Sequence, residues 1–412
     1  TILSENFIFT VEEVQKYQQP DPNKDLMNLI KKGLRSPLYH LMGRAWMENL
    51  GDRVSTPRGV SALISLLVFP CIYLLCRELF GSPSVGWMTV VLTAVSPLQV
   101  IYAQEAREYS MWTVTVLLSY WALFRVVRFN TTVNWLVYAA TLMLTLYTHL
   151  FSVIVVLGHG VYFIIEKLNR KQSLLNKKIL PYLLICTIGF GLFVLGRIAN
   201  KGLPQPPCWT GWNKNHCGIS SPTPFPSLAQ TWILNLSRVF VDFNESFSYK
   251  NFWFYLPIIL LTIYSLYFLY RHTQKQIWLF IYILIGTLGL FLAVPDILLK
   301  GQGSTPIRYL IPSYLGIQIA IAYHFATKIT SGTQKIWQQG LWKVISLVLI
   351  TSGIVSCGVY TQTNTWWSKY AEYYHSEVAQ IVNQTDRSLV IAPWFNMLTL
   401  SHVLDSDVMM YD

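Results

Sequence analysis

Long apolar runs, separated by short polar stretches, set the pattern of this chain. About 20 helical residues are needed to cross the hydrocarbon core of a bilayer, and most of the runs reach or approach that length. The runs occupy residues 59–79, 85–102, 109–123, 135–147, 151–165, 179–195, 252–269, 277–294, 309–325 and 344–359. The pattern predicts an all-α, polytopic membrane protein with about ten spans.

Two of the runs, 135–147 and 151–165, are short and lie close together in the sequence. A single helix over both would be about 45 Å long, which exceeds the bilayer core without extreme tilt. The sequence therefore predicts two helices joined near residues 147–150.

The basic residues of the short loops predict how the chain is oriented. When the ten spans are threaded alternately, these residues fall on one side, which the positive-inside rule assigns to the cytoplasm. They are Arg125, Arg128, Lys167, Arg170, Lys171, Lys177, Lys178, Arg271, Lys275, Lys328, Lys335 and Lys343. The opposite side is predicted to be extracytoplasmic.

Composition agrees with a membrane location. The 412 residues are 53% hydrophobic and only 12% charged, which is more apolar than one globular core requires. The net charge of +11 is concentrated at predicted helix ends, where it meets anionic headgroups. We therefore expect membrane lipids as partners and no nucleic acid.

The polar regions divide the chain into three parts. Residues 1–58 are predicted to form a first extracytoplasmic loop with interfacial helices, and a first span is expected ahead of it. Residues 59–360 form the transmembrane bundle, with an outer loop at 199–251. The tail, 361–412, has a predicted helix at 366–382 and a strand-like run at 388–392, which indicates the start of a small, truncated α/β unit.

Candidate chemistry concentrates in the short outer turn within residues 96–112. Glu105, Arg107 and Glu108 lie there beside hydrocarbon, where charge is costly. If a helix begins near Ala103, Glu105 shares a face with Tyr109, and the helix dipole helps to keep its carboxylate ionised, as suits a base or a cation ligand. Alternatively, Glu105 or Glu108 pairs with Arg107 as an interfacial anchor.

Three further outer-side residues could contact a substrate. Arg308 stands at the outer mouth of a predicted span, where its guanidinium could hold a phosphate with two hydrogen bonds or could extend to lipid headgroups. The imidazoles of His149 and His40 can each bond a hydroxyl or a phosphate, although the structural role is favoured for each one taken alone.

Four segments resemble the GT-C membrane glycosyltransferases, in content and in order. They are SPLYHLMGRAW (36–46), RGVSALISLLVFPCIYLLCRELFG (58–81), SPLQVIYAQEAREYSMW (96–112) and RYLIPSYLG (308–316). The resemblance covers residues 10–412 and is nearest to the bacterial protein-mannosyltransferase-like branch, particularly its cyanobacterial members.

This resemblance implies a GT-C helical bundle that moves a sugar from a polyprenyl-phosphate donor, with inversion, to a protein, lipid or glycan acceptor. The expected location is the bacterial inner membrane, with the active site facing the periplasm. The phosphate is already a good leaving group, so a base and cationic stabilisation suffice. The resemblance fixes no cofactor, and a divalent metal is compatible with this chemistry but not required.

The family motifs carry over to five positions. Glu105 matches the second acidic position, and Arg107 and Tyr109 match its neighbours in the pattern EARxY; Arg308 and Tyr309 match an RY pair. The family's principal acidic residue, in its first outer loop, has no counterpart here, and we expect it ahead of the first residue.

Two other functions remain open. A polysaccharide polymerase or ligase also uses lipid-linked donors and has a long outer loop with Arg and His. A transporter would place charges in mid-span and interrupt paired helices in two related halves, which this sequence does not show.

Overall fold

A computed structural model describes residues 8–16, 37–51, 55–171, 191, 223–330, 335–363, 366–368, 374–385 and 388–411. The chain divides into two compact units. A helical unit comprises Ile30–Asp242 and Ser246–Cys357, and a small α/β unit comprises Thr1–Leu29, Phe243–Glu245 and Gly358–Asp412.

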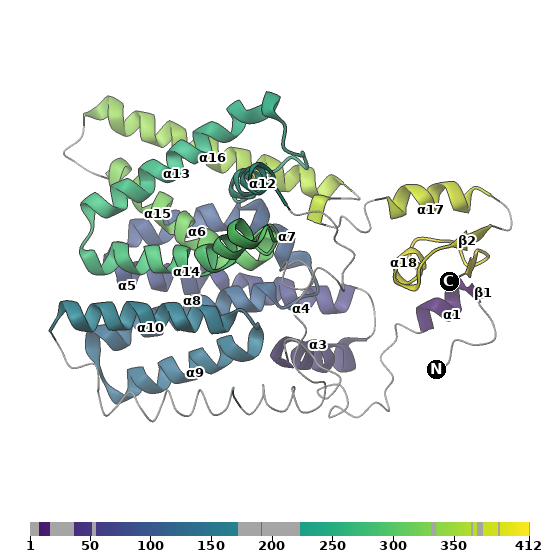
Figure 1. Cartoon of the computed structure of the whole chain (residues 1–412), viewed down its shortest axis with the longest axis horizontal. Helices are drawn as coiled ribbons and strands as arrows, with labels where there is room; N and C mark the ends of the chain where they lie inside the picture. The colour runs from purple at the N-terminus through teal and green to yellow at the C-terminus, as the bar shows by residue number, and fades with distance from the viewer. Residues whose placement is uncertain are drawn as a thin grey trace. The chain divides into compact units, whose positions relative to one another are not determined.

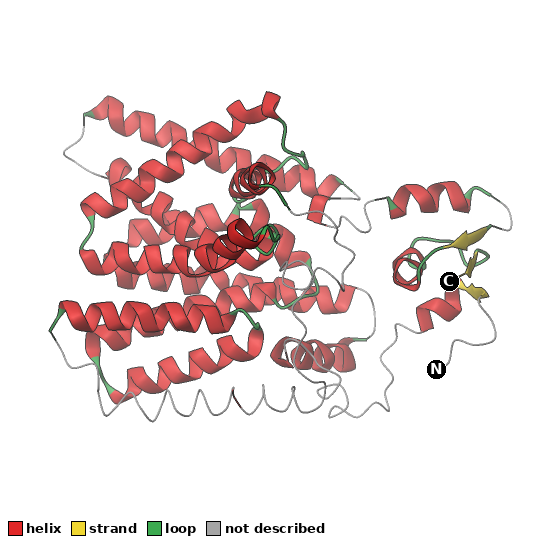
Figure 2. Ribbon diagram, in the orientation of Figure 1, coloured by secondary structure: helices red, strands yellow, loops and turns green. Residues whose placement is uncertain are grey.

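The helical unit is a bundle of long helices joined by short connections (Figures 1 and 2). Its helices are α3 (Pro37–Leu50), α4 (Ser55–Leu66), α5 (Val68–Phe80), α6 (Pro83–Ala94), α7 (Pro97–Gln104), α8 (Tyr109–Phe129), α9 (Thr132–Thr148), α10 (Ser152–Asn169), α12 (Phe225–Arg238), α13 (Phe252–His272), α14 (Lys275–Leu299), α15 (Ile311–Thr330) and α16 (Ile336–Gln362). Two 3₁₀ turns, η3 (Tyr249–Asn251) and η4 (Ile307–Leu310), precede α13 and α15.

Nine of the ten predicted spans coincide with these helices, and the run 179–195 lies, apart from residue 191, outside the described residues. Within the described part of the chain, six helices are long and apolar enough to cross a membrane: α4 with α5, α8, α10, α13, α14 and α16. The pair α6 and α7, bent by 60°, would be a seventh. The two helices predicted for the runs 135–147 and 151–165 are α9 and α10, and the chain does not form one long helix there.

Local sequence explains where several helices begin and end. Pro83 and Pro97 occupy the first positions of α6 and α7, where the missing N–H costs no hydrogen bond. Gly81 ends α5 with φ of 65° and donates its N–H to the Arg77 carbonyl. Asn130 ends α8 in the same left-handed region, with φ of 47°.

Helices α8 and α15 lie at the centre of the bundle, because nearly every side chain along them is buried. Helix α8 packs against α4, α5 and α9, and α15 packs against α6, α13 and α14. Gly316 of α15 allows close approach, since an added Cβ would lie 2.5 Å from the side chain of Ile285.

The small unit joins the two ends of the chain. A three-stranded sheet has the order β1 (Ile8–Thr10), β3 (Met409–Tyr411), β2 (Leu389–Ile391), antiparallel between β1 and β3 and parallel between β3 and β2. The helices α1 (Val11–Lys16), α17 (His375–Asn383) and α18 (Trp394–Leu400) complete it. Its core is made by Val11, Val14, Ala379, Val390, Met397, Leu400, Leu404, Val408 and Met410.

The tail was predicted to contain such a unit, but its partner strand was not foreseen. Strand β1 has only three residues, too few for a periodic signal. The predicted tail helix at 366–382 is shorter in the structure, because the helix that the structure describes there begins at His375.

Candidate active site

The charged turn 105–108 links α7 to α8 and is not helical. Helix α7 ends at Gln104, Glu105 has extended backbone with φ of −81° and ψ of 132°, and α8 begins at Tyr109. The predicted helix through Glu105 and Tyr109 is therefore wrong, because the chain must change direction between two helices. Glu108, directly ahead of α8, takes the favourable position at the helix N-terminus.

His149 lies against this turn, in the connection between α9 and α10. Its Nε2 is 4.0 Å from Oε1 of Glu108, and its ring stacks on Trp112 with centroids 4.2 Å apart. The backbone N–H of Phe151 donates to Nδ1 at 3.2 Å, which assigns the proton of the neutral ring to Nε2. This Nε2–H is directed toward the Glu108 carboxylate.

Burial keeps His149 neutral. The ring is 7% exposed, and burial lowers the pKa of His149 to about 4; Glu108 acts to raise the pKa and Arg308 to lower it. At pH 7 the side chain is therefore a neutral hydrogen-bond donor and carries no positive charge.

Arg308 reaches the same cluster from η4. Its guanidinium lies over the Tyr309 ring, 5.2 Å from the centroid, and its buried Nε has no hydrogen-bond partner among the described residues. The Tyr309 ring meets Phe151 edge-on at 4.8 Å and lies 6.3 Å from the His149 ring. The turn, the α9–α10 connection and η4 thus converge, and Tyr109, His149, Arg308 and Tyr309 come together.

Tyr102 lies near Glu105 and Arg308, although sequence reasoning did not single it out. Its phenol is within electrostatic range of Glu105, Arg107 and Arg308. Its ring packs edge-on against Tyr109 with centroids 5.1 Å apart. The available signal was its position three residues before Glu105 in the sequence.

The loop before Arg308 is fixed by a buried carboxylate that sequence reasoning also missed. Asp296 of α14 is 2% exposed and accepts hydrogen bonds from the backbone N–H of Gly303 (2.8 Å) and of Ser304 (2.6 Å) and from the Ser304 hydroxyl (2.6 Å). Trp232 of α12 donates to the same hydroxyl at 2.9 Å. An Asp within an apolar helix was the available signal.

His40 lies at the edge of the site. It is exposed on α3; partial burial lowers the pKa of His40, and nearby Glu108 acts to raise it. The neighbouring Tyr39 hydroxyl is 2.6 Å from that of Ser61, which donates to the Arg107 carbonyl at 3.3 Å. Helices α3 and α4 thereby support the turn.

Within the described ranges, no group of three or more His, Cys, Asp or Glu side chains is arranged to hold a metal ion.

Comparison with known proteins identifies the fold in which these side chains are arranged. Residues 35–195 match the family profile described as dolichyl-phosphate-mannose-protein mannosyltransferase. The crystal structure of ArnT from Cupriavidus metallidurans bound to undecaprenyl phosphate is similar, with a TM-score of 0.51 and 12% identity over 93% of this chain and 79% of that chain. The chain has the GT-C fold. No curated protein sequence matches it.

The GT-C resemblance predicted from the four motifs is thus confirmed, whereas the affinity to cyanobacterial members stays a prediction. The matched profile includes the turn 105–108 and His149, and Arg308 lies beyond it. A fold hosts many activities, so function has to be argued from the site.

Proposed function

We propose that this GT-C protein transfers a sugar from a polyprenyl-phosphate donor, with inversion, to an acceptor at the outer face of the membrane. The observation that carries the proposal is the cluster at the α7–α8 turn, where carboxylates, a neutral imidazole and an arginine with an unpartnered buried N–H converge. The fold supports it, as does the undecaprenyl phosphate bound to ArnT.

Arg308 would bind the donor phosphate. A guanidinium offers planar, paired donors that match phosphate oxygens, and the unpartnered Nε of Arg308 gains an acceptor when a phosphate binds. Negative charge grows on the phosphate as the sugar–phosphate bond breaks, so a fixed cation stabilises the transition state more than the ground state. Arg107, in the facing turn, would add a second cation.

Glu105 would act as the base that deprotonates the acceptor hydroxyl. It occupies the acidic position of the EARxY pattern, in which the position of Glu108 is unspecified. Glu108 would instead act on His149, keeping its Nε2–H directed into the cluster, where a sugar hydroxyl can accept it. The rings of Tyr109 and Tyr309 would line the donor path.

The outer face in this proposal is the periplasmic side of a bacterial inner membrane. The basic residues at the ends of α8, α10 and α13 lie at the opposite ends of those helices from the cluster, and the positive-inside rule assigns them to the cytoplasm. A periplasmic acceptor would be a protein, a lipid or a glycan.

Two glutamates in one turn allow a matched test. The full chain, in membrane vesicles, is given a panel of radiolabelled polyprenyl-phosphate sugars, and transfer is measured for wild type, Glu105→Gln and Glu108→Gln. Loss of a general base lowers rates by roughly 10²–10⁴-fold, so we expect at least a 100-fold loss in Glu105→Gln and a much smaller loss in Glu108→Gln.

The reverse order would assign the base to Glu108, and undiminished transfer by both variants would refute the proposed site. Thermal unfolding of the three proteins controls for misfolding. The products separate the rival functions: a single added sugar supports the transferase, whereas a preassembled glycan chain indicates a polymerase or ligase.

A further inference from the structure

A second polar site lies far from the cluster. A cavity of about 890 Å³ opens among the ends of α5, α8, α10, α13 and α14, beside Tyr323 of α15. The cluster borders the first turn of α8 and this cavity borders its last turn, so the 21-residue helix separates them by about 30 Å. The positive-inside rule predicts that this end of the bundle is cytoplasmic.

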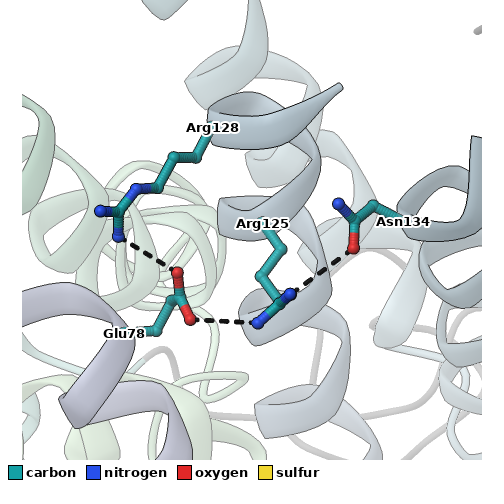
Figure 3. A network of polar contacts seen from close by, with 4 residues as sticks. All are labelled: Glu78, Arg125, Arg128 and Asn134. Carbon is teal, nitrogen blue, oxygen red and sulfur yellow. Dashed lines mark hydrogen bonds and ion pairs between the residues drawn. The ribbon is translucent and has the colours of Figure 1, made fainter. Parts of the chain in front are cut away.

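The cavity wall is strongly basic. Four arginines line it, Arg77, Arg125, Arg128 and Arg170, together with one acidic residue, Glu78. The Glu78 carboxylate lies between two of them, 3.3 Å from Nη1 of Arg125 and 3.3 Å from Nη1 of Arg128 (Figure 3). Arg170 is paired with Glu166 outside the lining, with its Nε 2.6 Å from Oε1, so the lining keeps a formal excess of two positive charges once that pair is counted.

These arginines retain hydrogen-bond donors for a ligand. A guanidinium has five N–H groups; Arg128 uses one on Glu78, and Arg125 uses one on Glu78 and one on Asn134 (Figure 3). Both contacts to Glu78 are longer than the 2.7–2.9 Å of strong charged hydrogen bonds. Arg77 is exposed and has no ion pair within the described part of the chain.

The rest of the wall is partly polar, with His272, Thr273, Gln274 and Gln276, and partly apolar. Leu74, Trp121, Phe124 and Ile277 line the cavity beside the arginines. The Arg125 guanidinium lies over the Trp121 ring, 5.2 Å from its centroid, which fixes the charge at the border between the polar and apolar parts. A ligand that fills this cavity needs a negative head and an apolar body.

We propose that this cavity binds the phosphate headgroup of an anionic phospholipid, with an acyl chain along the apolar wall. Basic pockets between membrane helices on the cytoplasmic side bind such headgroups, because their positive charges lie at the level of the headgroups in the membrane. The site is separate from the sugar-transfer chemistry, and lipid binding there is independent of the proposed function.

Arg77→Gln with Arg128→Gln, in the full chain, tests the proposal. Both side chains are exposed, so their loss leaves the helix packing intact. The control is Lys343→Gln, which removes one positive charge from α16 outside the cavity. Phosphatidylglycerol bound to the purified protein is counted by native mass spectrometry, after exchange into phosphatidylcholine nanodiscs with graded phosphatidylglycerol.

Each arginine near a membrane surface contributes roughly fivefold in affinity, so we expect roughly a 25-fold weaker retention of phosphatidylglycerol in the double variant. The control should retain as much as wild type. Equal retention by all three proteins would overturn the proposal. Inorganic phosphate that displaces phosphatidylglycerol at comparable concentration would also overturn it, by identifying a soluble phosphate as the ligand.

Discussion

Replacing His149 by Phe should destabilise the protein at neutral pH and stabilise it at acidic pH. The phenyl ring can keep the stacking on Trp112, but it removes both the titrating group and the acceptor for the Phe151 N–H. The lost hydrogen bond costs about 1 kcal/mol at every pH. The lost titration changes the free energy of unfolding only where His149 would gain a proton.

The size of that change follows from the burial of the ring. The pKa of His149 falls from the ordinary 6.5 to about 4 on folding. Between these values the unfolded chain binds the additional proton, so stability rises with pH, is fully present above pH 6.5 and is lost as the pH falls toward 4. The whole window amounts to about 3 kcal/mol, of which about 2 kcal/mol is already lost at pH 5.

Wild type should therefore be more stable than His149→Phe at pH 7.5 and less stable at pH 5, by about 1 kcal/mol each way. Unfolding midpoints of the full chain in nanodiscs, followed by tryptophan fluorescence across this range, measure the crossing. Parallel curves for wild type and His149→Phe would refute the burial argument.

Two substitutions test how the helical unit holds its parts. Asp296→Asn should lower the free energy of unfolding by about 1–3 kcal/mol, because an amide leaves one of the buried hydrogen-bond donors of Ser304 unpaired. The measurement is the unfolding midpoint. An unchanged midpoint would show that other contacts hold this loop. Gly353→Ala should destabilise by about 1–3 kcal/mol, because its Cβ would lie 2.5 Å from the Val95 carbonyl oxygen. Gly358→Ala, five residues further along the same helix with nothing within 4 Å of the added Cβ, should be neutral or stabilising, and equal midpoints for both glycine variants would contradict the predicted clash.

The helices could be predicted because the hydrophobic signal for a span is local and long. Pro97 marks a break between α6 and α7, but the 60° bend could not be predicted, since Ser96 at this break contacts a segment that is distant in the sequence. Its hydroxyl donates to the carbonyl of Val239, a residue distant in sequence, at 2.6 Å. Strand β1 was missed for the same reason, because its partner Met409–Tyr411 comes from the other end of the chain.

The candidate site was predicted in part. Glu105, Arg107 and Arg308 were visible as charges beside apolar runs, where each is costly enough to require a reason. Asp296 escaped attention because its role appears only when the loop before Arg308 folds back onto α14. The sequence does not show which distant segments pack together. This packing decides which of the two glutamates, Glu105 or Glu108, lies against His149.

Helix α8 carries opposite charges at its two ends, and each end contributes to a different site. Glu108 stands at its N-terminus, Arg125 and Arg128 lie in its last two turns, and the residues from Tyr109 to Phe124 carry no charge. The helix dipole favours an anion at the first position and cations at the last, and the uncharged stretch is what a bilayer core requires. The same arrangement holds a carboxylate against His149 and supplies two arginines to the lipid cavity. Moving charge along α8 should therefore disturb orientation in the membrane, the proposed transfer site and the proposed lipid binding together, whereas substitutions confined to one end should separate them.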